Sequence, residues 1–83
     1  MNTNNQIRSL VPATRGPIRF ENVFPGSFFK IVAEPSRGIR ASSDDRLYRK
    51  ARDHEGFFAV VTETGEAAVL MPYDIVQPLK TGK

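Results

Sequence analysis

The stretch GFFAVVTETGEAAVLMPYDIVQPL, residues 56–79, predicts the fold of this chain more clearly than any other. Its first apolar run, residues 57–62, is rich in aromatic and β-branched side chains, which suit the pleated, half-buried surface of a strand. A second apolar run follows at residues 67–71. Gly65 lies in the short polar segment between the two runs and adopts a positive φ without steric cost. The stretch therefore predicts an antiparallel hairpin.

The end of the same stretch predicts how the sheet is completed. Pro72 lacks a backbone N–H, so we expect it to end the second strand of the hairpin. A tight turn at residues 73–74 then leads into a short closing strand over residues 75–79. Since Pro78 also lacks this donor, we expect the closing strand to lie at an edge of the sheet.

The residues before the hairpin predict two more strands. Residues 27–33, SFFKIVA, and residues 46–52, RLYRKAR, each alternate between two faces. A long polar loop, residues 34–45, separates them, and residues 18–23 predict a short ordered lead-in. The fold class that follows is all-β, a small barrel of about five antiparallel strands.

Composition divides the chain into three segments. Residues 1–16 predict a flexible basic arm, residues 17–79 the barrel domain, and residues 80–83 a basic tail. Within the arm, the apolar residues 10–12 leave an alternative open, in which this segment docks on a neighbour in an extended conformation.

Length, charge and cysteine content narrow the class of protein. The 83 residues allow one domain with a small core, and the absence of cysteine excludes disulfides and thiolate metal ligands. No apolar run is long enough for a signal peptide or a membrane span, so we expect a soluble, cytoplasmic protein without a membrane partner. The formal net charge is +3, but all nine acidic side chains lie between residues 21 and 79. The body is therefore slightly acidic and both ends are basic, which disfavours a reader of duplex DNA grooves.

The predicted hairpin has no plainly polar face. Side chains alternate along a strand, and apolar residues occupy both sets of positions. Either the rest of the chain covers the outer face, or one face is an interface between copies of the chain. The candidate interface residues are apolar side chains of the hairpin: Phe57, Phe58, Val60, Val69 and Leu70.

Basic and aromatic side chains gather in the long loop, in the strand after it and in the turn before the closing strand. Such side chains bind phosphate groups and stack on bases. Acidic residues are interleaved with them, so a solvated and internally paired surface is the alternative. The candidate binding residues are Arg37, Arg40, Tyr48, Arg49, Lys50 and Tyr73.

Residues suited to catalysis or metal binding are sparse. His54 is the single histidine, and its place in the turn before the hairpin predicts a solvated side chain rather than an acid or base. Asp44 and Asp45 are sequence neighbours whose side chains point apart, so we expect them to hold the loop rather than to act as paired carboxylates. The sequence predicts no catalytic residue, no metal site and no cofactor.

The order of the predicted elements resembles that of the SH3-like barrel over residues 27–79. Residues 68–76, AVLMPYDIV, carry the resemblance best and look like the last strands of that fold with a 3₁₀ turn between them. SH3 domains bind proline-rich peptides in an aromatic groove that includes a tryptophan, and Phe57 and Phe58 stand in its place here. The resemblance implies an architecture rather than a function.

Two further resemblances are to small proteins. Residues 55–57 (EGF) and 68–72 (AVLMP) are similar to the later strands of plasmid-borne type II dihydrofolate reductases, without the Val-Gln-Ile-Tyr motif of their pore. Residues 20–29 (FENVFPGSFF) and 48–51 (YRKA) are similar to uncharacterised small proteins of phages and mobile genetic elements. The first resemblance implies a precedent for a small barrel that oligomerises, and neither implies an activity.

Three functions follow as hypotheses. The first is a non-catalytic binding module that forms homo-oligomers through the hairpin and meets a protein or nucleic-acid partner through residues 34–45 and the adjacent basic strand. The second is a nucleic-acid-associated accessory protein that uses its basic ends and residues 34–52. The third is an enzyme whose active site lies at a pore between identical subunits.

Overall fold

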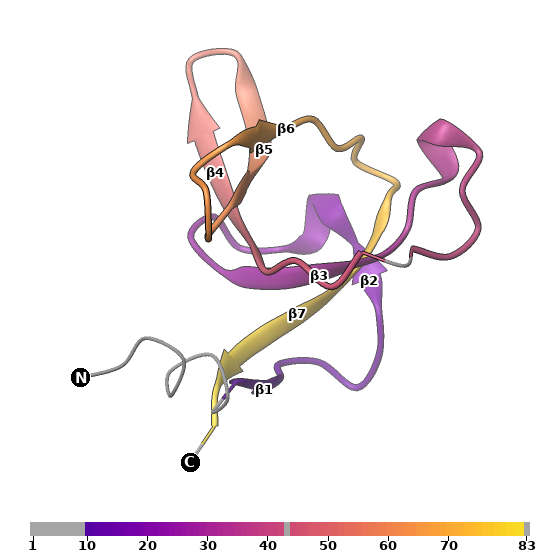
Figure 1. Ribbon diagram of the computed structural model, residues 1–83, viewed down its shortest axis with the longest axis vertical. Coiled ribbons are helices and arrows are strands. Elements are labelled where there is room, and N and C mark those ends of the chain that lie inside the picture. The colour runs from indigo at the N-terminus through magenta and orange to yellow at the C-terminus, as the bar shows by residue number, and fades with distance from the viewer. Residues whose placement is uncertain (1–9, 43, 83) are drawn as a thin grey trace.

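The computed structural model describes residues 10–42 and 44–82, which form one β-sheet and two single-turn 3₁₀ helices (Figure 1). The elements in chain order are β1 (Leu10–Pro12), β2 (Ile18–Arg19), η1 (Phe20–Asn22), β3 (Phe28–Ala33), η2 (Pro35–Arg37), β4 (Tyr48–Asp53), β5 (Gly56–Val61), β6 (Ala67–Ala68) and β7 (Ile75–Thr81).

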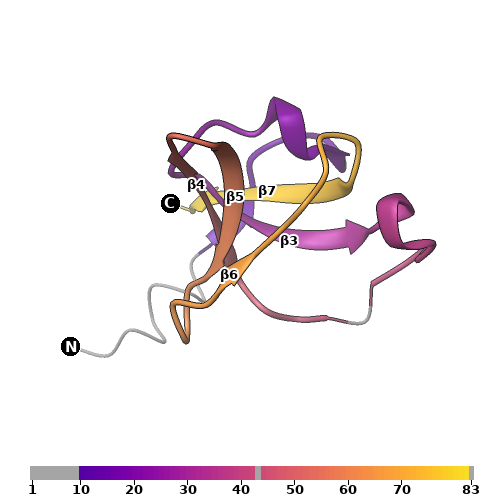
Figure 2. The same ribbon diagram turned by 90° about the horizontal axis from the view of Figure 1, so that it is seen from above.

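The strands pair antiparallel in the order β1–β7–β3–β4–β5–β6, with β2 also beside β7. The prediction of an all-β, antiparallel fold is confirmed. The described residues form seven strands rather than about five, and no pairing among them joins β6 to β1 or β2, so the sheet does not close into a barrel. In both views, β4 and β5 run in a clearly different direction from β3 and β7, because the sheet is strongly curved (Figure 1 and Figure 2).

The closing strand is central, so the expectation that Pro78 confines it to an edge is wrong. β7 pairs with β3 on one side and with both β1 and β2 on the other. The carbonyl of Pro78 accepts a hydrogen bond from the N–H of Ala13 at 2.9 Å, so it points toward the side of β1 and β2. The donor that proline lacks would point the same way, into the gap between these two short strands. It would face Ala13, where β1 ends, so the pairing of β7 with β3 is intact and the central position is tolerated.

The hairpin is present, but its second strand is shorter than predicted. β6 ends at Ala68 rather than at residue 71. Leu70 turns into the core, and the N–H of Met71 donates to the carboxylate of Asp74 at 2.9 Å. A side-chain acceptor of the following turn thus takes a backbone donor that a longer strand would use in the sheet.

The domain extends beyond the boundaries expected from composition. Residues 10–12 form β1, in which Leu10 lies opposite Thr81 of β7, so they belong to the sheet rather than to an arm. Lys80 likewise lies in β7 rather than in a tail. Residues 1–9 of the expected arm and Lys83 of the expected tail lie outside the described residues.

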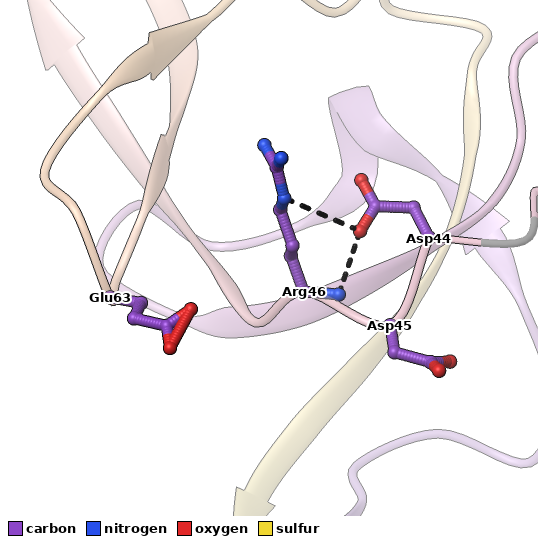
Figure 3. A pocket seen from close by; sticks show the side chains of 4 residues that line it. All are labelled: Asp44, Asp45, Arg46 and Glu63. Atoms are coloured by element: carbon purple, nitrogen blue, oxygen red, sulfur yellow. Dashed lines mark hydrogen bonds and ion pairs between the residues drawn. The ribbon is translucent and has the colours of Figure 1, made fainter.

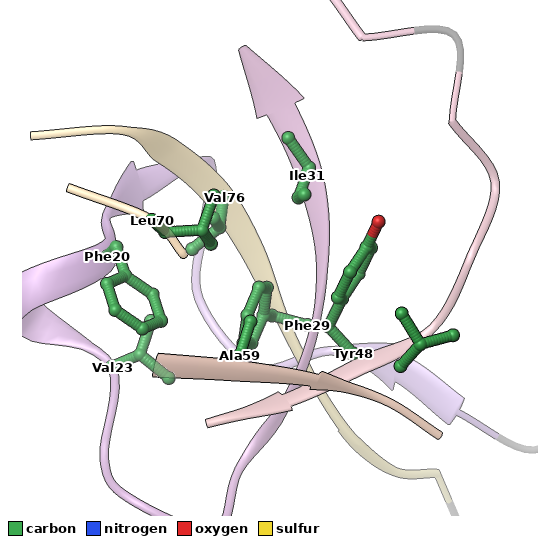
Figure 4. Close-up of a cluster of buried hydrophobic side chains, with 9 residues drawn as sticks. Phe20, Val23, Phe29, Ile31, Tyr48, Ala59, Leu70 and Val76 are labelled. Carbon is green, nitrogen blue, oxygen red and sulfur yellow. The ribbon is translucent and has the colours of Figure 1, made fainter. Parts of the chain in front are cut away.

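One hydrophobic core lies on the inner face of the sheet. The ring of Phe29 is fully buried, and its centroid lies 5.6 Å from that of Phe20 in an edge-to-face contact and 5.7 Å from that of Tyr48 in a stacked one. Phe20 belongs to η1, so this helix contributes to the core although it is not part of the sheet. The buried members of the cluster are Phe20, Val23, Phe29, Ile31, Tyr48, Ala59, Val61, Leu70 and Val76 (Figure 4).

A buried carboxylate fixes the turn that leads into β7. Asp74 is 0 % exposed, and its Oδ1 accepts the N–H of Ser36 at 3.1 Å. Its Oδ2 accepts the hydroxyl of Ser36 at 2.8 Å and the N–H of Met71 at 2.9 Å. Because Ser36 belongs to η2, this side chain holds the start of the long loop against the turn before β7.

Replacing this carboxylate tests whether it joins the two segments. We expect Asp74→Asn to lower the free energy of unfolding by about 3 kcal/mol, because an amide nitrogen cannot accept these N–H groups and leaves a buried donor without a partner. Urea denaturation measures the change. Asp45→Asn, at an exposed position of the long loop, is the control, with an expected change within about 0.5 kcal/mol. Equal stability of the two variants would contradict this role of Asp74.

Candidate functional site

The six candidate binding residues do not come together in one site. Tyr48 and Lys50 point from β4 into the core, whereas Arg49 between them is exposed on the opposite face. Side-chain alternation along the strand thus separates Arg49 from both of its neighbours. The other three are exposed: Arg37 lies at the end of η2, and Arg40 and Tyr73 lie in a loop and a turn.

Lys50 is 2 % exposed, and its ammonium group is hydrogen-bonded inside the protein. Its Nζ donates to the carbonyl oxygens of Phe20 at 2.9 Å and Val23 at 2.7 Å, and that of Glu21 lies 3.5 Å away. Nζ also lies 4.6 Å from the ring centroid of Phe20 and 4.5 Å from that of Phe57. Burial lowers the pKa of Lys50, and the negative charge of Glu21 opposes this shift. Lys50 therefore ties η1 to β4 instead of meeting a ligand at the surface.

Removing the ammonium group tests this tie. We expect Lys50→Met to lower the free energy of unfolding by roughly 2 kcal/mol, because two buried carbonyls lose their donor while the burial of a charge is relieved. Urea denaturation provides the measurement, with the exposed Lys80→Met as the control at less than about 0.5 kcal/mol. A Lys50→Met protein as stable as the unmodified chain would show that the buried charge costs as much as its hydrogen bonds contribute.

Tyr48 and Asp44 join the long loop to the core. The hydroxyl of Tyr48 donates to Oδ2 of Asp44, and Oδ1 of Asp44 accepts the N–H of Arg46 at 2.8 Å. Burial, together with the hydrogen bond to Asp44 and its charge, raises the pKa of Tyr48 to about 12. For Asp44, burial acts to raise the pKa, but the hydrogen bonds from Tyr48 and Arg46 and the charge of Arg46 outweigh it and lower the pKa.

The tyrosine pKa is directly measurable, since the chain has two tyrosines and Tyr73→Phe leaves Tyr48 as the only one. We expect phenolate absorbance, read immediately after a pH jump, to reach half its maximum at about pH 12. Adding Asp44→Asn should lower this midpoint, because the negative charge that opposes ionisation is gone. A folded-state pKa raised above 10.0 stabilises the fold below pH 10.0, and this contribution is lost as the pH rises through about 12. A midpoint near pH 10.0 that does not change with Asp44→Asn would refute the raised pKa of Tyr48 and its dependence on Asp44.

Two adjoining hollows share Asp44 and Arg46. The first is open to solvent, has a volume of about 590 Å³, and is lined by Asp44, Asp45, Arg46 and Glu63 (Figure 3). The second is more enclosed, has a volume of about 510 Å³, and combines apolar with charged side chains. Its lining residues are Ile31, Glu34, Arg37, Asp44, Arg46, Tyr48, Ala68, Val69 and Leu70.

The convex outer face of the sheet, away from the core, combines apolar side chains with two cations. Phe28 of β3 lies opposite Arg49 of β4, Arg49 lies opposite Val60 of β5, and Val60 lies opposite Ala67 of β6. Opposed side chains on paired strands have Cβ atoms about 5 Å apart, so these residues form one row across four strands. We call the whole set the outer-face surface: Phe28, Lys30, Arg49, Ala51, Phe58, Val60, Ala67, Gln77 and Leu79.

The outer-face surface carries charge of one sign. Lys30 and Arg49 are exposed, and none of its nine residues is acidic. Asp53, at the hairpin end of β4, is the next residue on this face, and its Oδ1 accepts the N–H groups of Glu55 at 2.8 Å and Gly56 at 3.2 Å. The acidic groups of the β4–β5 hairpin thus lie at its turn, and the middle of the outer-face surface carries positive charge only.

The five candidate interface residues also separate. Phe58 and Val60 are half-buried on the outer-face surface. Phe57 lies on the inner side, beside the ammonium group of Lys50. Val69 is 76 % exposed and lines the second hollow, and Leu70 is buried in the core. These residues do not form a single contact surface.

The acid–base and metal-binding candidates stay apart. His54 is exposed in the β4–β5 turn, with its Nε2 3.7 Å from a carboxylate oxygen of Glu55. In the part of the chain that the structure describes, no group of three or more His, Cys, Asp or Glu side chains is placed to hold a metal ion. None of the helices in residues 10–42 and 44–82 has the length and apolar character needed to cross a membrane.

Comparison with known proteins adds no assignment. No protein-family model, no curated protein and no solved structure matches this chain significantly. The function therefore has to be argued from the surfaces of the molecule.

Sequence reasoning did not single out the residues that complete the outer-face surface. The alternation within residues 27–33 does separate Phe28 and Lys30 from Phe29, and this signal is readable in the sequence. The register that sets Phe28 opposite both Arg49 and Leu79 is not readable, because it joins strands far apart in the chain.

Proposed function

We propose that the protein is a non-catalytic binding module that contacts single-stranded nucleic acid through its outer-face surface. The observation that carries the proposal is the row of Phe28, Arg49 and Val60 across three paired strands, on a face without an acidic residue at its centre. This proposal develops the second of the three sequence-based hypotheses, the nucleic-acid-associated protein. It places the contact on the outer face of the sheet instead of on the long loop.

The chemistry of the face supports such a ligand. Phe28 is 36 % exposed and Phe58 is half-buried, so both rings offer surface on which unpaired bases stack. Arg49 lies directly between strands that carry these rings, and Lys30 follows Phe28 by two residues on the same face. Cations next to aromatic platforms are the combination that single-stranded nucleic acids require. The strand pairing holds these groups in place, which reduces the entropy lost on binding.

A second copy of the chain is the other partner that this face suits. Phe58 and Val60 are half-buried apolar side chains at neighbouring outward positions, and burying them against a copy is favourable. A two-fold contact, however, sets this face against itself and brings Lys30 and Arg49 close to their own copies without an acidic residue to pair with. Charge therefore favours an anionic partner, and the homo-oligomer is the second candidate function.

Binding to a labelled oligothymidylate of about 12 nucleotides, followed by fluorescence anisotropy, tests the first candidate. With two cations engaged, we expect log K to fall with log salt at a slope of about −1.4. Arg49→Ala should weaken binding about fivefold and reduce the slope to about −0.7. Phe28→Leu should weaken binding at least about fivefold with no change in slope, because it removes a stacking platform but no charge.

The matched control is Arg40→Ala, an exposed arginine of the loop, which should leave binding unchanged. Equal losses of affinity for Arg40→Ala and Arg49→Ala would mean that the net charge of the protein alone attracts the oligonucleotide. Light scattering on the same proteins addresses the second candidate. A dimer that Val60→Glu dissociates, with no oligonucleotide binding, would replace the first candidate with the second.

A further inference from the structure

The second hollow lies beside the free edge of the sheet and differs in character from the outer-face surface. β6 pairs with β5 on one side, and no described strand pairs with its other side. Ala68, Val69 and Leu70 form the wall of the hollow that continues from this edge. We infer that this groove binds an extended, basic segment of a partner protein, which lies along β6 and inserts an apolar side chain into the hollow.

The apolar part of the hollow's lining, which lies beside charged side chains, argues for an apolar side chain as the anchor. Its volume of about 510 Å³ lies within the usual range of ligand pockets, about 300–1,000 Å³. Ile31 and Leu70 are buried members of the core that also line the hollow. Val69 is 76 % exposed at its wall, next to the last residue of β6. An inserted aliphatic side chain would cover this apolar surface and remove it from water.

The free strand edge argues for an extended peptide rather than a small molecule. An unpaired edge presents backbone N–H and C=O groups that a further strand can use. Peptides that add a strand to a sheet gain affinity from these bonds and specificity from pockets for alternate side chains. Here the pocket lies directly beside the edge, so both contributions are available to one ligand.

The charges at the rim specify a basic segment. The two joined hollows are lined by the carboxylates of Glu34, Asp44, Asp45 and Glu63 and by the guanidinium groups of Arg37 and Arg46. Each arginine already lies against one of these carboxylates: Arg37 is 3.5 Å from Glu34, and Arg46 is 3.9 Å from Asp44. Within the second hollow these charges balance, and the exposed Asp45 and Glu63, which line the adjoining first hollow, give the two hollows together a net negative charge. Complementary charges favour the encounter with a lysine-rich or arginine-rich partner.

The test uses three capped octapeptides with ¹⁵N-labelled protein and follows the amide chemical shifts. The first peptide alternates valine and lysine, the second valine and glutamate, and the third serine and lysine. We expect saturable shifts at residues 67–70 and 44–48 with the valine–lysine peptide. Binding of the other two should be at least about tenfold weaker, because one lacks the charge and the other the apolar anchor.

Two variants locate the contact without disturbing the fold, since both side chains are exposed. Val69→Ser should weaken valine–lysine binding several-fold by removing apolar surface, and Glu63→Gln by removing rim charge. Glu55→Gln, in the distant β4–β5 turn, is the matched control and should bind as the unmodified protein does. Thermal unfolding of each variant, with an unchanged midpoint, confirms that the fold is intact.

Several results would overturn the inference. These are the absence of shifts at about 1 mM peptide, shifts confined to another surface, or equal binding of the serine–lysine peptide, which would indicate charge attraction alone. Unchanged affinity of Val69→Ser would do the same. Ala67, at the edge of the sheet, belongs to both the groove and the outer-face surface, but Arg49 does not line the groove, so Arg49→Ala should retain peptide binding. A failure of peptide binding in the groove and a failure of oligonucleotide binding on the outer-face surface are therefore separate outcomes.

Discussion

The hydrogen bonds that Lys50 makes to η1 are the interaction on which the rest of the structure depends. The sheet does not close, so its core needs a cover where strands are missing, and η1 supplies one through Phe20. A single turn of 3₁₀ helix has little stability of its own. The ammonium group reaches it from the middle of β4 and donates to the carbonyl of Phe20 within η1 and to that of Val23 directly after it. The rings of Phe20 and Phe57 replace part of the lost hydration. Backbone carbonyl dipoles and aromatic ring faces therefore hold the buried ammonium group of Lys50. Among the described residues, no carboxylate forms an ion pair with it.

The same strand divides the molecule into its two surfaces. Inward positions of β4 place Tyr48 and Lys50 in the core, and the outward position between them places Arg49 at the centre of the outer-face surface. Tyr48 then reaches through the inner side to Asp44 and so fixes the rim of the second hollow. A domain this small buries a limited core, so both faces of its sheet remain partly available for contacts. Charge distinguishes them, because the outer face is positive and the rim of the hollows is negative.

Local signals in the sequence were sufficient for the fold class and for the positions of the main strands. Alternation located β3 and β4, and the glycine-containing turn located the β5–β6 hairpin. The central position of β7 was not predictable, because a proline excludes a central strand only when its missing donor faces a paired neighbour, and that depends on register. The burial of Lys50 was equally hidden, since its acceptors lie about thirty residues earlier, in η1 and at the residue that follows it. Of the candidate site residues, only those within a strand, such as Arg49, could be assigned to one face of the sheet from the sequence, because side chains alternate along the strand.

The central place of β7 has a consequence for how the chain acquires its structure during synthesis. β1, β2 and β3 all pair with β7, yet the ribosome produces β7 after every one of them. Until it emerges, β3 exposes an unpaired edge, and β1 and β2 have no partner within the sheet. Contacts between residues so far apart in the chain also form slowly, because a long loop has to be closed first. The nascent chain therefore carries strands without their sheet partner until β7 is available, and unpaired strand edges favour aggregation during that period.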